Sequence, residues 1–461
     1  LLGLDDGQPK DTAWAASICG LDEDDIRDLA RRMAAGPTLI SVAHGLQRAE
    51  HGEQPIWMAI TLAAMLGDIG RPGAGFAYAL GIFANIGEPP LAVGIPSFPQ
   101  GRNPSGAFIP VARIADMLLH PGAGFDYDGQ ALTYPDIRLV YWAGGNPFHH
   151  HQDLGRLRRA FARPETIVVH EPYWTATARH ADIVLPTTIT LERDDIGSSR
   201  NDPGVIAMHR LLPPRGEARD DFVIFAALAG RLGHGEAFTE GRDADGWLRH
   251  IYAGLASRLE AAGAEAPSFE AFWESGELQL PVRDEVGGWL RRFRGDPDAY
   301  PLRTPSGRIE IFSESIAGFG YADCPGHPTW LPPDEWLGGE RAASYPLQLV
   351  ANQPAGRLHS QLDFGAASLA RKRDGREIAR LHPVDARARS IGSGDVVRLF
   401  NDRGACFAAA ALDEAVRPGC VQLPTGAWFD PLEAADPPTC LAGNPNTLTR
   451  DRGTSSLAQA C

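Results

Sequence analysis

The feature that most constrains the fold is the stretch 139–195, where short apolar runs alternate with polar loops. Three apolar runs of strand length lie at 139–142, 167–169 and 183–185. Between the first two, residues 154–161 have the apolar spacing of a helix, with Leu157 and Phe161 four residues apart. The order strand, loop, helix, strand predicts a βαβ unit with a parallel sheet. Ligands of such sheets bind beyond the carboxyl ends of the strands, where both polar loops of this stretch fall.

The rest of the chain predicts more α/β structure, followed by a small β domain. Helices are expected within 1–36, 56–66, 109–119 and 220–232, a strand at 38–42, and mostly helical structure over 235–300. We interpret 77–110 as a long ordered loop and 304–313 as a turn leading into a strand. Short β runs at 347–350, 396–401, 406–412 and 420–423 are typical of a small closed barrel. The predicted fold is α/β, with a parallel-sheet, Rossmann-like domain at 1–234, a mostly helical connecting region at 235–340 and a β-barrel domain at 341–461.

Composition excludes several classes of protein. The 461 residues carry a net charge of -15, which argues against a general nucleic-acid binder because such proteins need a basic surface. No apolar run reaches 18 residues, so no membrane span is expected. The six cysteines are scattered and form no CxxC pair, which argues against a zinc ribbon or an iron–sulfur loop. The chain begins with Leu1 instead of Met, and we expect it to be a fragment.

The loops of the central stretch contain the first candidate ligand-binding residues. Residues 144–147 (Gly-Gly-Asn-Pro) directly follow a strand, so backbone N–H groups there either hold a diphosphate or form an ordinary βα turn. Three consecutive histidines, 149–151, cannot all face one metal ion from a helix, so we favour a helix start with one histidine turned to a ligand. His170 and Glu171 suit hydrogen bonding to a heterocycle or ribose, and Thr175 serves equally as a helix cap. Two interpretations are open for Arg48, Arg193 and Asp221: they pair with a phosphate or a base of a ligand, or they form plain surface ion pairs.

Two polar clusters of the C-terminal part offer similar chemistry. Residues 352–361 follow its first strand, and 443–446 and 451–455 lie further along. Asn and Gln side chains carry donors and acceptors that can read the edge of a pterin or purine, although Asn-Pro also forms turns. A nucleophile–base triad, a phosphate-binding Walker loop and a GxGxxG motif are all missing from the sequence.

Several motifs resemble those of the prokaryotic molybdopterin oxidoreductases. A family signature is similar to WTATARHADIVLPTTITLE, and further matches are GGNPFHHHQD, LQRAEHGEQPIWM, TPSGRIEIFSE, ANQPAGRLHSQLD, FNDRGA and GNPNTLTRDRGTSSLAQ. They occur in the order of the family and cover nearly the whole chain. The motifs LQRAEHGEQP and LHSQLD resemble the branch of dimethyl sulfoxide, trimethylamine N-oxide and biotin sulfoxide reductases.

The resemblance implies a cofactor of two molybdopterin guanine dinucleotides around one molybdenum. It implies that the C-terminal domain is a six-stranded double-psi β-barrel and that 1–234 and 341–461 each bind one dinucleotide, with 235–340 in the shell of the catalytic domain. Positions that match the family's contacts to one dinucleotide are Arg48, Asn146, His150, His170, Glu171, Arg193 and Asp221. Positions that match its contacts to the other are Gln353, His359, Ser360, Asn444 and Asn446.

The resemblance also has a gap. Nothing here matches the N-terminal part of the family, which supplies the serine ligand of molybdenum and the aromatic residues near the substrate, so the chain resembles the C-terminal three-fifths of such an enzyme. We therefore assign no metal ligand and no catalytic residue, and we expect the chain alone to be inactive. The implied reaction is reduction of an S-oxide or N-oxide, with electrons from a donor such as a cytochrome or reductase. A formate dehydrogenase or nitrate reductase relative and a metal-free scaffold are the alternatives, and the compartment stays open, with the periplasm favoured over the cytoplasm.

Overall fold

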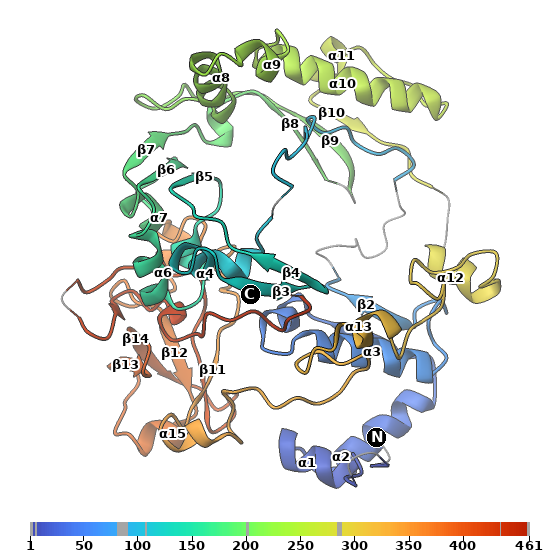
Figure 1. Ribbon diagram of the computed structural model, residues 1–461, viewed down its shortest axis with the longest axis vertical. Helices are drawn as coiled ribbons and strands as arrows, with labels where there is room; N and C mark the ends of the chain where they lie inside the picture. Colours follow the sequence, from blue (N-terminus) through green and yellow to red (C-terminus); the bar gives the residue numbers. More distant parts are fainter. Residues whose placement is uncertain are drawn as a thin grey trace.

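The computed structural model describes residues 3–4, 7–80, 91–106, 108–199, 202–283, 288–433 and 435–458. Figure 1 shows the helices α8–α11 together at the top, α12 and α13 to the right, α1 and α2 at the bottom, and the C-terminal strands with α15 at the lower left. The described helices that follow the central sheet in the chain are α8 (Asp221–Arg231), α9 (Gly235–Thr239), α10 (Ala244–Ala261), α11 (Phe269–Ser275), α12 (Gly288–Gly295), α13 (Glu314–Phe319), α14 (Ala366–Leu369) and α15 (Pro383–Arg387). No described helix combines the length and the apolar character needed to cross a bilayer.

The first unit pairs two short parallel strands over one helix. Its elements are α1 (Thr12–Cys19), α2 (Glu23–Ala34), β1 (Leu39–Val42), α3 (Glu53–Met65) and β2 (Gly75–Tyr78). β1 pairs with β2 in parallel. The predicted helix within 1–36 is two helices, because Gly20 ends the first one in the left-handed conformation at φ 63°. The first residues of the predicted loop 77–110 belong to β2, and residues 81–90 and 107 lie outside the described residues.

The central sheet confirms the predicted βαβ unit. Strands β5 (Leu139–Ala143), β6 (Thr166–Glu171) and β7 (Ile183–Pro186) are parallel in the order β5-β6-β7. The loops after β5 and β6 contain α5 (Pro147–His150), α6 (Leu154–Phe161) and α7 (Ala176–Arg179). Asp153 caps α6 by accepting from the backbone N–H of Arg156, and Thr175 caps α7, so the capping role considered for Thr175 is confirmed. The carboxyl ends of β5 and β6 therefore meet at one edge.

Two antiparallel sheets complete the middle of the chain. α4 (Ile114–Leu119) precedes a hairpin of β3 (Gly124–Tyr127) and β4 (Gln130–Thr133), and β8 (Asp195–Ser199), β9 (Asp202–Met208) and β10 (Glu277–Gln279) form the other sheet. The strand predicted within 304–313 is wrong. Side chains satisfy the backbone there instead: the Thr304 hydroxyl donates locally to the Arg308 carbonyl at 2.6 Å, and the distant Trp57 donates from Nε1 to the Glu310 carbonyl at 2.9 Å.

The C-terminal part is a curled, mixed sheet. Its six strands are β11 (Gln348–Val350), β12 (Ile378–Leu381), β13 (Val396–Phe400), β14 (Ala405–Leu412), β15 (Cys420–Gln422) and β16 (Thr439–Cys440). β12 pairs in parallel with β14 and antiparallel with β15. The sequence predicted four of these strands and missed β12 and β16. β12 is four residues long with an arginine at its third position, and β16 has only two residues, so neither shows a clear apolar period.

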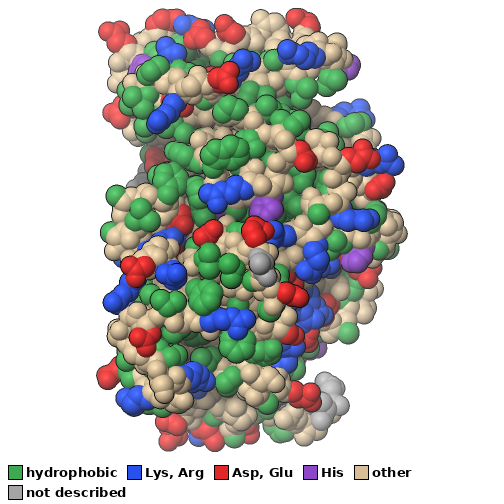
Figure 2. Space-filling view, turned by 90° about the vertical axis from the view of Figure 1, so that its left-hand side faces the viewer, with side chains coloured by type: hydrophobic (Ala, Val, Ile, Leu, Met, Phe, Trp, Pro, Cys, Tyr) green, Lys and Arg blue, Asp and Glu red, His purple; other side chains and the backbone are tan. Residues whose placement is uncertain are grey.

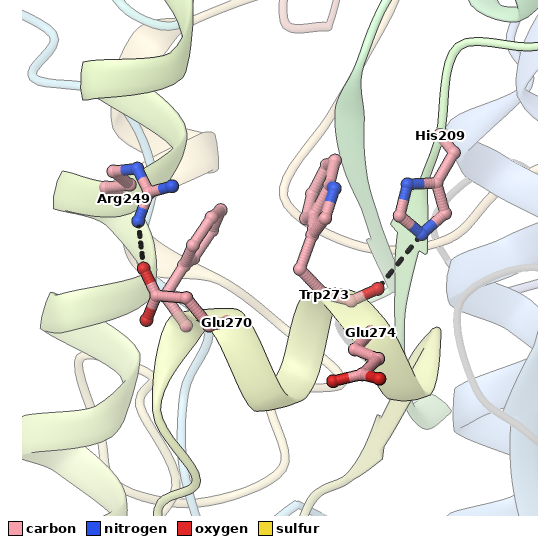
Figure 3. Close-up of a pocket in the computed structure, with 6 residues that line it drawn as sticks. His209, Arg249, Glu270, Trp273 and Glu274 are labelled. Carbon is pink, nitrogen blue, oxygen red and sulfur yellow. Dashed lines mark hydrogen bonds and ion pairs between the residues drawn. The ribbon is translucent and has the colours of Figure 1, made fainter.

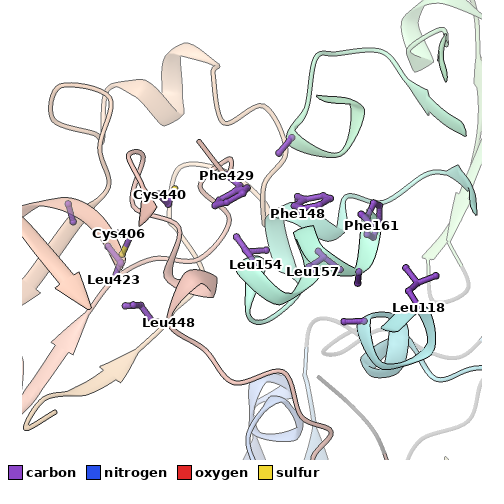
Figure 4. Packing of buried hydrophobic residues seen from close by; sticks show 14 of the residues in the cluster. Leu118, Phe148, Leu154, Leu157, Phe161, Cys406, Leu423, Phe429, Cys440 and Leu448 are labelled. Atoms are coloured by element: carbon purple, nitrogen blue, oxygen red, sulfur yellow. The ribbon is translucent and has the colours of Figure 1, made fainter. Parts of the chain in front are cut away.

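One hydrophobic core joins the central and C-terminal parts (Figure 4). Phe148 lies at its centre and is completely buried, with its ring 4.9 Å from that of Phe161 and 6.2 Å from that of Phe429. Leu154 and Leu157 of α6 are completely buried beside it, as the helical spacing predicts. Because each buried side chain of this size contributes about 1.5–3 kcal/mol, this core holds the two parts as one body.

A late segment of the chain ties back to the first unit. The hydroxyls of Thr454 and Ser455 donate to Glu53 Oε1 of α3 at 2.7 and 2.5 Å, and the His51 backbone N–H donates to the Thr454 carbonyl at 2.9 Å. Ser456 donates from its backbone N–H to Asp323 at 2.9 Å. Elsewhere the surface mixes charged and apolar side chains, as the face in Figure 2 shows.

Candidate cofactor-binding site

The two polar loops of the central sheet meet at its carboxyl edge. Asn146 follows β5 and Glu171 ends β6, and Asn146 Nδ2 donates to Glu171 Oε2 at 3.0 Å. The Thr175 hydroxyl donates to the same oxygen at 3.2 Å. Burial raises the pKa of Glu171, and these two hydrogen bonds partly oppose that effect. Asn146 Oδ1 is buried and has no hydrogen-bond partner among the described residues, so an acceptor remains at this edge for a ligand.

A chain of three polar side chains lies behind this edge. His170 Nε2 lies 2.7 Å from the Tyr141 hydroxyl, and His170 Nδ1 lies 2.6 Å from Asp221 Oδ1. The Phe225 ring stacks on the imidazole with a centroid distance of 4.9 Å. Burial, and then the charge of Asp221, raises the pKa of Tyr141. Both nitrogens of His170 are thus engaged, which fixes the orientation of its ring.

A large cavity of about 1760 Å³ opens between the central sheet, the connector 333–346 and the C-terminal sheet. Six of the candidate residues from the sequence line it, namely Arg48, Asn146, His150, Gln353, His359 and Asn446. Apolar side chains of the C-terminal strands, among them Leu381 and Leu399, line another part of its wall. The cavity therefore combines polar groups from both parts of the chain with an apolar surface, which is typical of cofactor sites.

The wall of the cavity is basic although the protein is acidic. Among the described residues seven arginines line it against two glutamates, and the arginines are Arg48, Arg341, Arg389, Arg398, Arg403, Arg450 and Arg452. Arg403 makes a bidentate pair with Glu335, with both nitrogen–oxygen distances at 2.7 Å. Arg452 pairs with Glu50 at 3.1 Å and with Asp334 at 2.8 Å. An arginine excess of this kind favours an anionic ligand such as a diphosphate.

The three consecutive histidines have three different environments. His150 lines the cavity with its ring 6.4 Å from that of His359, and burial, followed by the charges of His359 and Arg48, lowers the pKa of His150 to about 4. His151 Nε2 lies 3.4 Å from Asp451 Oδ1, close enough for charge attraction without forming an aligned hydrogen bond. His149 is completely buried and stacks on Trp428 at 5.2 Å. Of the three, His150 and His151 line the cavity, and they lie at the end of α5. The expectation of one histidine turned to a ligand from a helix start is therefore wrong in both respects.

We expect stability to fall as the pH drops below 6.5 because of His149. Neither of its ring nitrogens has a hydrogen-bond partner among the described residues, and burial lowers its pKa to about 3. The unfolded chain takes up a proton at this histidine near pH 6.5 while the folded chain does not. The free energy of unfolding therefore falls by about 1.4 kcal/mol for each pH unit between 6.5 and about 3. His149→Phe keeps the ring on Trp428 and should flatten the urea midpoint measured between pH 7 and pH 5. His120→Phe, at an exposed histidine, is the matched control, and an unchanged slope in His149→Phe would contradict the expectation.

The remaining candidate residues lie outside the cavity wall. Arg193 pairs with Asp195 at 3.3 Å and donates to the Thr188 carbonyl at 3.3 Å. Asn444 is completely buried, with Nδ2 donating to the Ala427 carbonyl at 2.8 Å. The Ser360 carbonyl accepts from Trp428 Nε1 at 2.8 Å. Asn444 and Ser360 therefore hold the loops in which their neighbours Asn446 and His359 reach the cavity.

Sequence reasoning missed most of the arginines on the cavity wall. Arg403 and Arg452 stand beside glycines in motifs that were recognised, FNDRGA and RDRGTSS, so a basic residue in a loop after a strand was an available signal. Arg341 and Arg389 lie in a connector and after a short helix, where no motif marks them.

A second pocket of about 280 Å³ lies far from these residues, on α11 (Figure 3). His209 Nε2 lies 3.0 Å from the Trp273 carbonyl, and Arg249 donates to Glu270 at 2.5 Å. His209, Arg249 and Glu270 thus have partners within the pocket, and none of the candidate residues lines it. The large cavity is the better candidate for a functional site.

The residues of the large cavity fit a dinucleotide. Arginines suit a diphosphate, and Asn146, Gln353 and Asn446 offer amide groups to a heterocycle. Unpartnered buried atoms at the wall, Asn146 Oδ1 and Gln152 Oε1, supply free acceptors among the described residues. Fold and cavity together define an α/β protein with a large, basic cavity between a parallel sheet and a curled mixed sheet, whose lining suits a large anionic cofactor.

Comparison with known proteins identifies the family. The model described as "Molybdopterin oxidoreductase" matches residues 18–231, and the model described as "Molydopterin dinucleotide binding domain" matches residues 347–461. The chain belongs to the molybdopterin oxidoreductases. The cofactor that the two models indicate is a molybdopterin dinucleotide, which carries molybdenum.

Three relatives show where in the family the similarity is strong. The whole chain is 50% identical over 463 residues to a biotin sulfoxide reductase of Cereibacter sphaeroides and 44% identical over 475 residues to a dimethyl sulfoxide/trimethylamine N-oxide reductase of Rhodobacter capsulatus. It is 44% identical over 478 residues to a trimethylamine-N-oxide reductase of Haemophilus influenzae. The match covers 61%, 57% and 58% of these proteins, so the chain spans about three-fifths of the length of the relatives.

A solved structure has a similar fold. The acetylene hydratase of Pelobacter acetylenicus aligns with a TM-score of 0.52 at 21% sequence identity, over 68% of this chain and 41% of that one. The likeness supports the mixed α/β fold with parallel sheets.

Proposed function

We propose that this chain binds both dinucleotides of a bis-molybdopterin guanine dinucleotide cofactor in an S-oxide or N-oxide reductase. The observation that carries the proposal is the arginine-rich cavity, in which candidate residues from the central part and from the C-terminal part line one wall. The strong similarity to biotin sulfoxide and trimethylamine N-oxide reductases supports this branch over a formate dehydrogenase or nitrate reductase relationship.

The proposal divides the contacts between two domains. Residues 1–234 bind one dinucleotide through Arg48, Asn146, His150, His170, Glu171, Arg193 and Asp221. Residues 341–461, as a six-stranded double-psi β-barrel, bind the other through Gln353, His359 and Asn446, with Ser360 and Asn444 acting through the loops they hold. Residues 235–340 contribute to the shell. The mixed parallel and antiparallel pairing of β12 supports a barrel of this kind.

The chemistry divides between the cofactor and the chain. When bound, the molybdenum cofactor supplies two-electron oxygen-atom transfer, which reduces an S-oxide or N-oxide and releases water. This chain binds and orients: the arginines neutralise the phosphates, Asn146 and Gln353 present amides, and His150 stays neutral because of its lowered pKa. Among the described residues no three His, Cys, Asp or Glu form a cluster able to hold a metal ion, and the proposal assigns no ligand of molybdenum to this chain.

The test is the cofactor content of the full-length protein purified from a host supplied with molybdate. We expect molybdenum by elemental analysis and, after denaturation, two guanine nucleotides per metal. Asn146→Ala and His359→Ala should each lower both by about tenfold, because each loses hydrogen bonds to a charged ligand. Asn103→Ala and His234→Ala are exposed matched controls. A wild-type protein without metal or nucleotide would identify the chain as a scaffold and overturn the proposal.

A further inference from the structure

The Arg357 guanidinium is the centre of the loop that brings His359 to the cavity. Its side chain is only 4% exposed. Nε donates to the His359 carbonyl at 3.1 Å, Nη2 donates to the Thr425 carbonyl at 3.0 Å, and Nη1 donates to the Ser368 hydroxyl at 3.0 Å. One side chain thus joins the loop to α14 and to the segment that follows β15.

Four charges are buried together around this guanidinium. Arg357 Nη2 lies 2.9 Å from Glu377 Oε1 as a charge contact, and Arg357 Nη1 lies 3.3 Å from Asp363 Oδ1. Lys372 Nζ lies 2.6 Å from Asp363 Oδ1 and 3.4 Å from Glu377 Oε1. Two positive and two negative charges balance, which is the condition for burying them without a large desolvation cost. A lysine at position 357 would keep that balance.

The loop itself holds two non-glycine residues in the left-handed conformation. His359 and Leu362 both have φ 49°, a conformation that is unfavourable for such residues and needs support from its surroundings. A Cβ at Gly426 would lie 2.1 Å from the His359 carbonyl oxygen, so only glycine allows this carbonyl to sit between position 426 and Arg357 Nε. Trp428 Nε1 holds the next carbonyl, that of Ser360, at 2.8 Å.

We propose that Arg357 is a positioning residue, whose fork of donors sets the backbone of 357–363 so that His359 presents its side chain to the cofactor cavity. The proposal rests on the proposed function for the role of His359. The purely structural alternative is that Arg357 only neutralises the charges of Asp363 and Glu377. A lysine at position 357 could take over that neutralising role but not the positioning role. Lysine supplies the charge but not the planar set of donors to two carbonyls and a hydroxyl.

The experiment compares Arg357→Lys with Lys372→Met in the full-length protein from a molybdate-supplied host. Lys372→Met disturbs the same buried charges without a contact to the His359 carbonyl, so it controls for lost stability. We expect Arg357→Lys to lower guanine nucleotide and molybdenum per chain about tenfold, since the variant loses hydrogen bonds of a charged donor that hold the loop of His359. Lys372→Met should keep the wild-type content while lowering the thermal midpoint at least as much.

A second readout does not depend on the cofactor. Cleavage by chymotrypsin within 358–364, which includes Leu358, Leu362 and Phe364, should rise about tenfold in Arg357→Lys and stay unchanged in Lys372→Met. Wild-type content and wild-type cleavage in Arg357→Lys would reduce Arg357 to a counter-charge and overturn the inference, as would equal losses in both variants. If the wild-type protein holds no cofactor, the proposed function fails, and the cleavage ratio alone decides whether Arg357 positions the loop.

Discussion

Replacing Phe148 with alanine should lower the free energy of unfolding by about 3–5 kcal/mol. The ring is completely buried, stacks on His180 at 3.9 Å and packs between Phe161 of the central part and Phe429 of the C-terminal part. Its removal leaves a cavity in the core that joins the two parts, because neighbours on both sides are fixed by other contacts. Urea and thermal unfolding report the change.

The matched control is Phe312→Ala, since Phe312 is 54% exposed and loses little burial. We expect it to shift stability by less than about 0.5 kcal/mol. A loss in Phe148→Ala no larger than that of the control would mean that the core across the two parts contributes nothing to stability. Two separate unfolding transitions in Phe148→Ala would instead show that this ring couples the unfolding of the central part to that of the C-terminal part.

Replacing Arg156 with methionine should cost a similar amount, about 3–5 kcal/mol, for an electrostatic reason. Arg156 Nη1 lies 2.5 Å from Asp451 Oδ2, and Nη2 contacts Asp116. Asp451 is only 3% exposed, so without the arginine its charge is buried with His151 alone nearby. Although burial acts in the opposite direction, the hydrogen bond and charge of Arg156 hold the pKa of Asp116 below its usual value. Because methionine keeps the apolar part of the side chain, the variant tests the loss of the charge separately from the loss of packing.

Arg163→Met serves as the control at an exposed arginine close to the end of α6. The wild-type protein should gain stability from Asp116 above pH 3.8 and lose it as the pH falls through the lowered pKa of this carboxyl. Arg156→Met should lack that dependence. Equal urea midpoints for the two methionine variants at pH 7 would show that the buried pair makes no net contribution.

Local patterns in the sequence predicted the elements whose own residues determine them. The helix α6 follows from the spacing of Leu157 and Phe161, and the order of β5, α6 and β6 follows from one strand-loop-helix-strand pattern. The strand β12 could not be predicted, because its four residues gain their β conformation from pairing with β14 and β15 on both sides. The strand predicted within 304–313 is wrong for the converse reason. β-branched residues are present there, but a local polar bond and a bond from Trp57 already use the backbone carbonyls.

The candidate site was likewise predictable from the sequence only in part. Motifs indicated Asn146 and His359 separately, and only the folded chain brings them to one cavity. The basic wall could not be predicted from local sequence, since Arg403 faces the cavity with Glu335, a partner 68 residues away in the connector. The support beneath His359 depends on Gly426 and Trp428, which come from another loop.

The contacts of Thr454 and Ser455 with Glu53 have a consequence for biosynthesis. The partners of this bond are separated by 401 residues, so at 5–20 residues per second the ribosome needs roughly 20–80 s between the two. During that interval α3 has β1 and β2 beside it but lacks its bonds to Thr454 and Ser455, and the cavity lacks the wall that carries Asn446 and Arg452. The cavity can therefore be completed only tens of seconds after α3 has been synthesised.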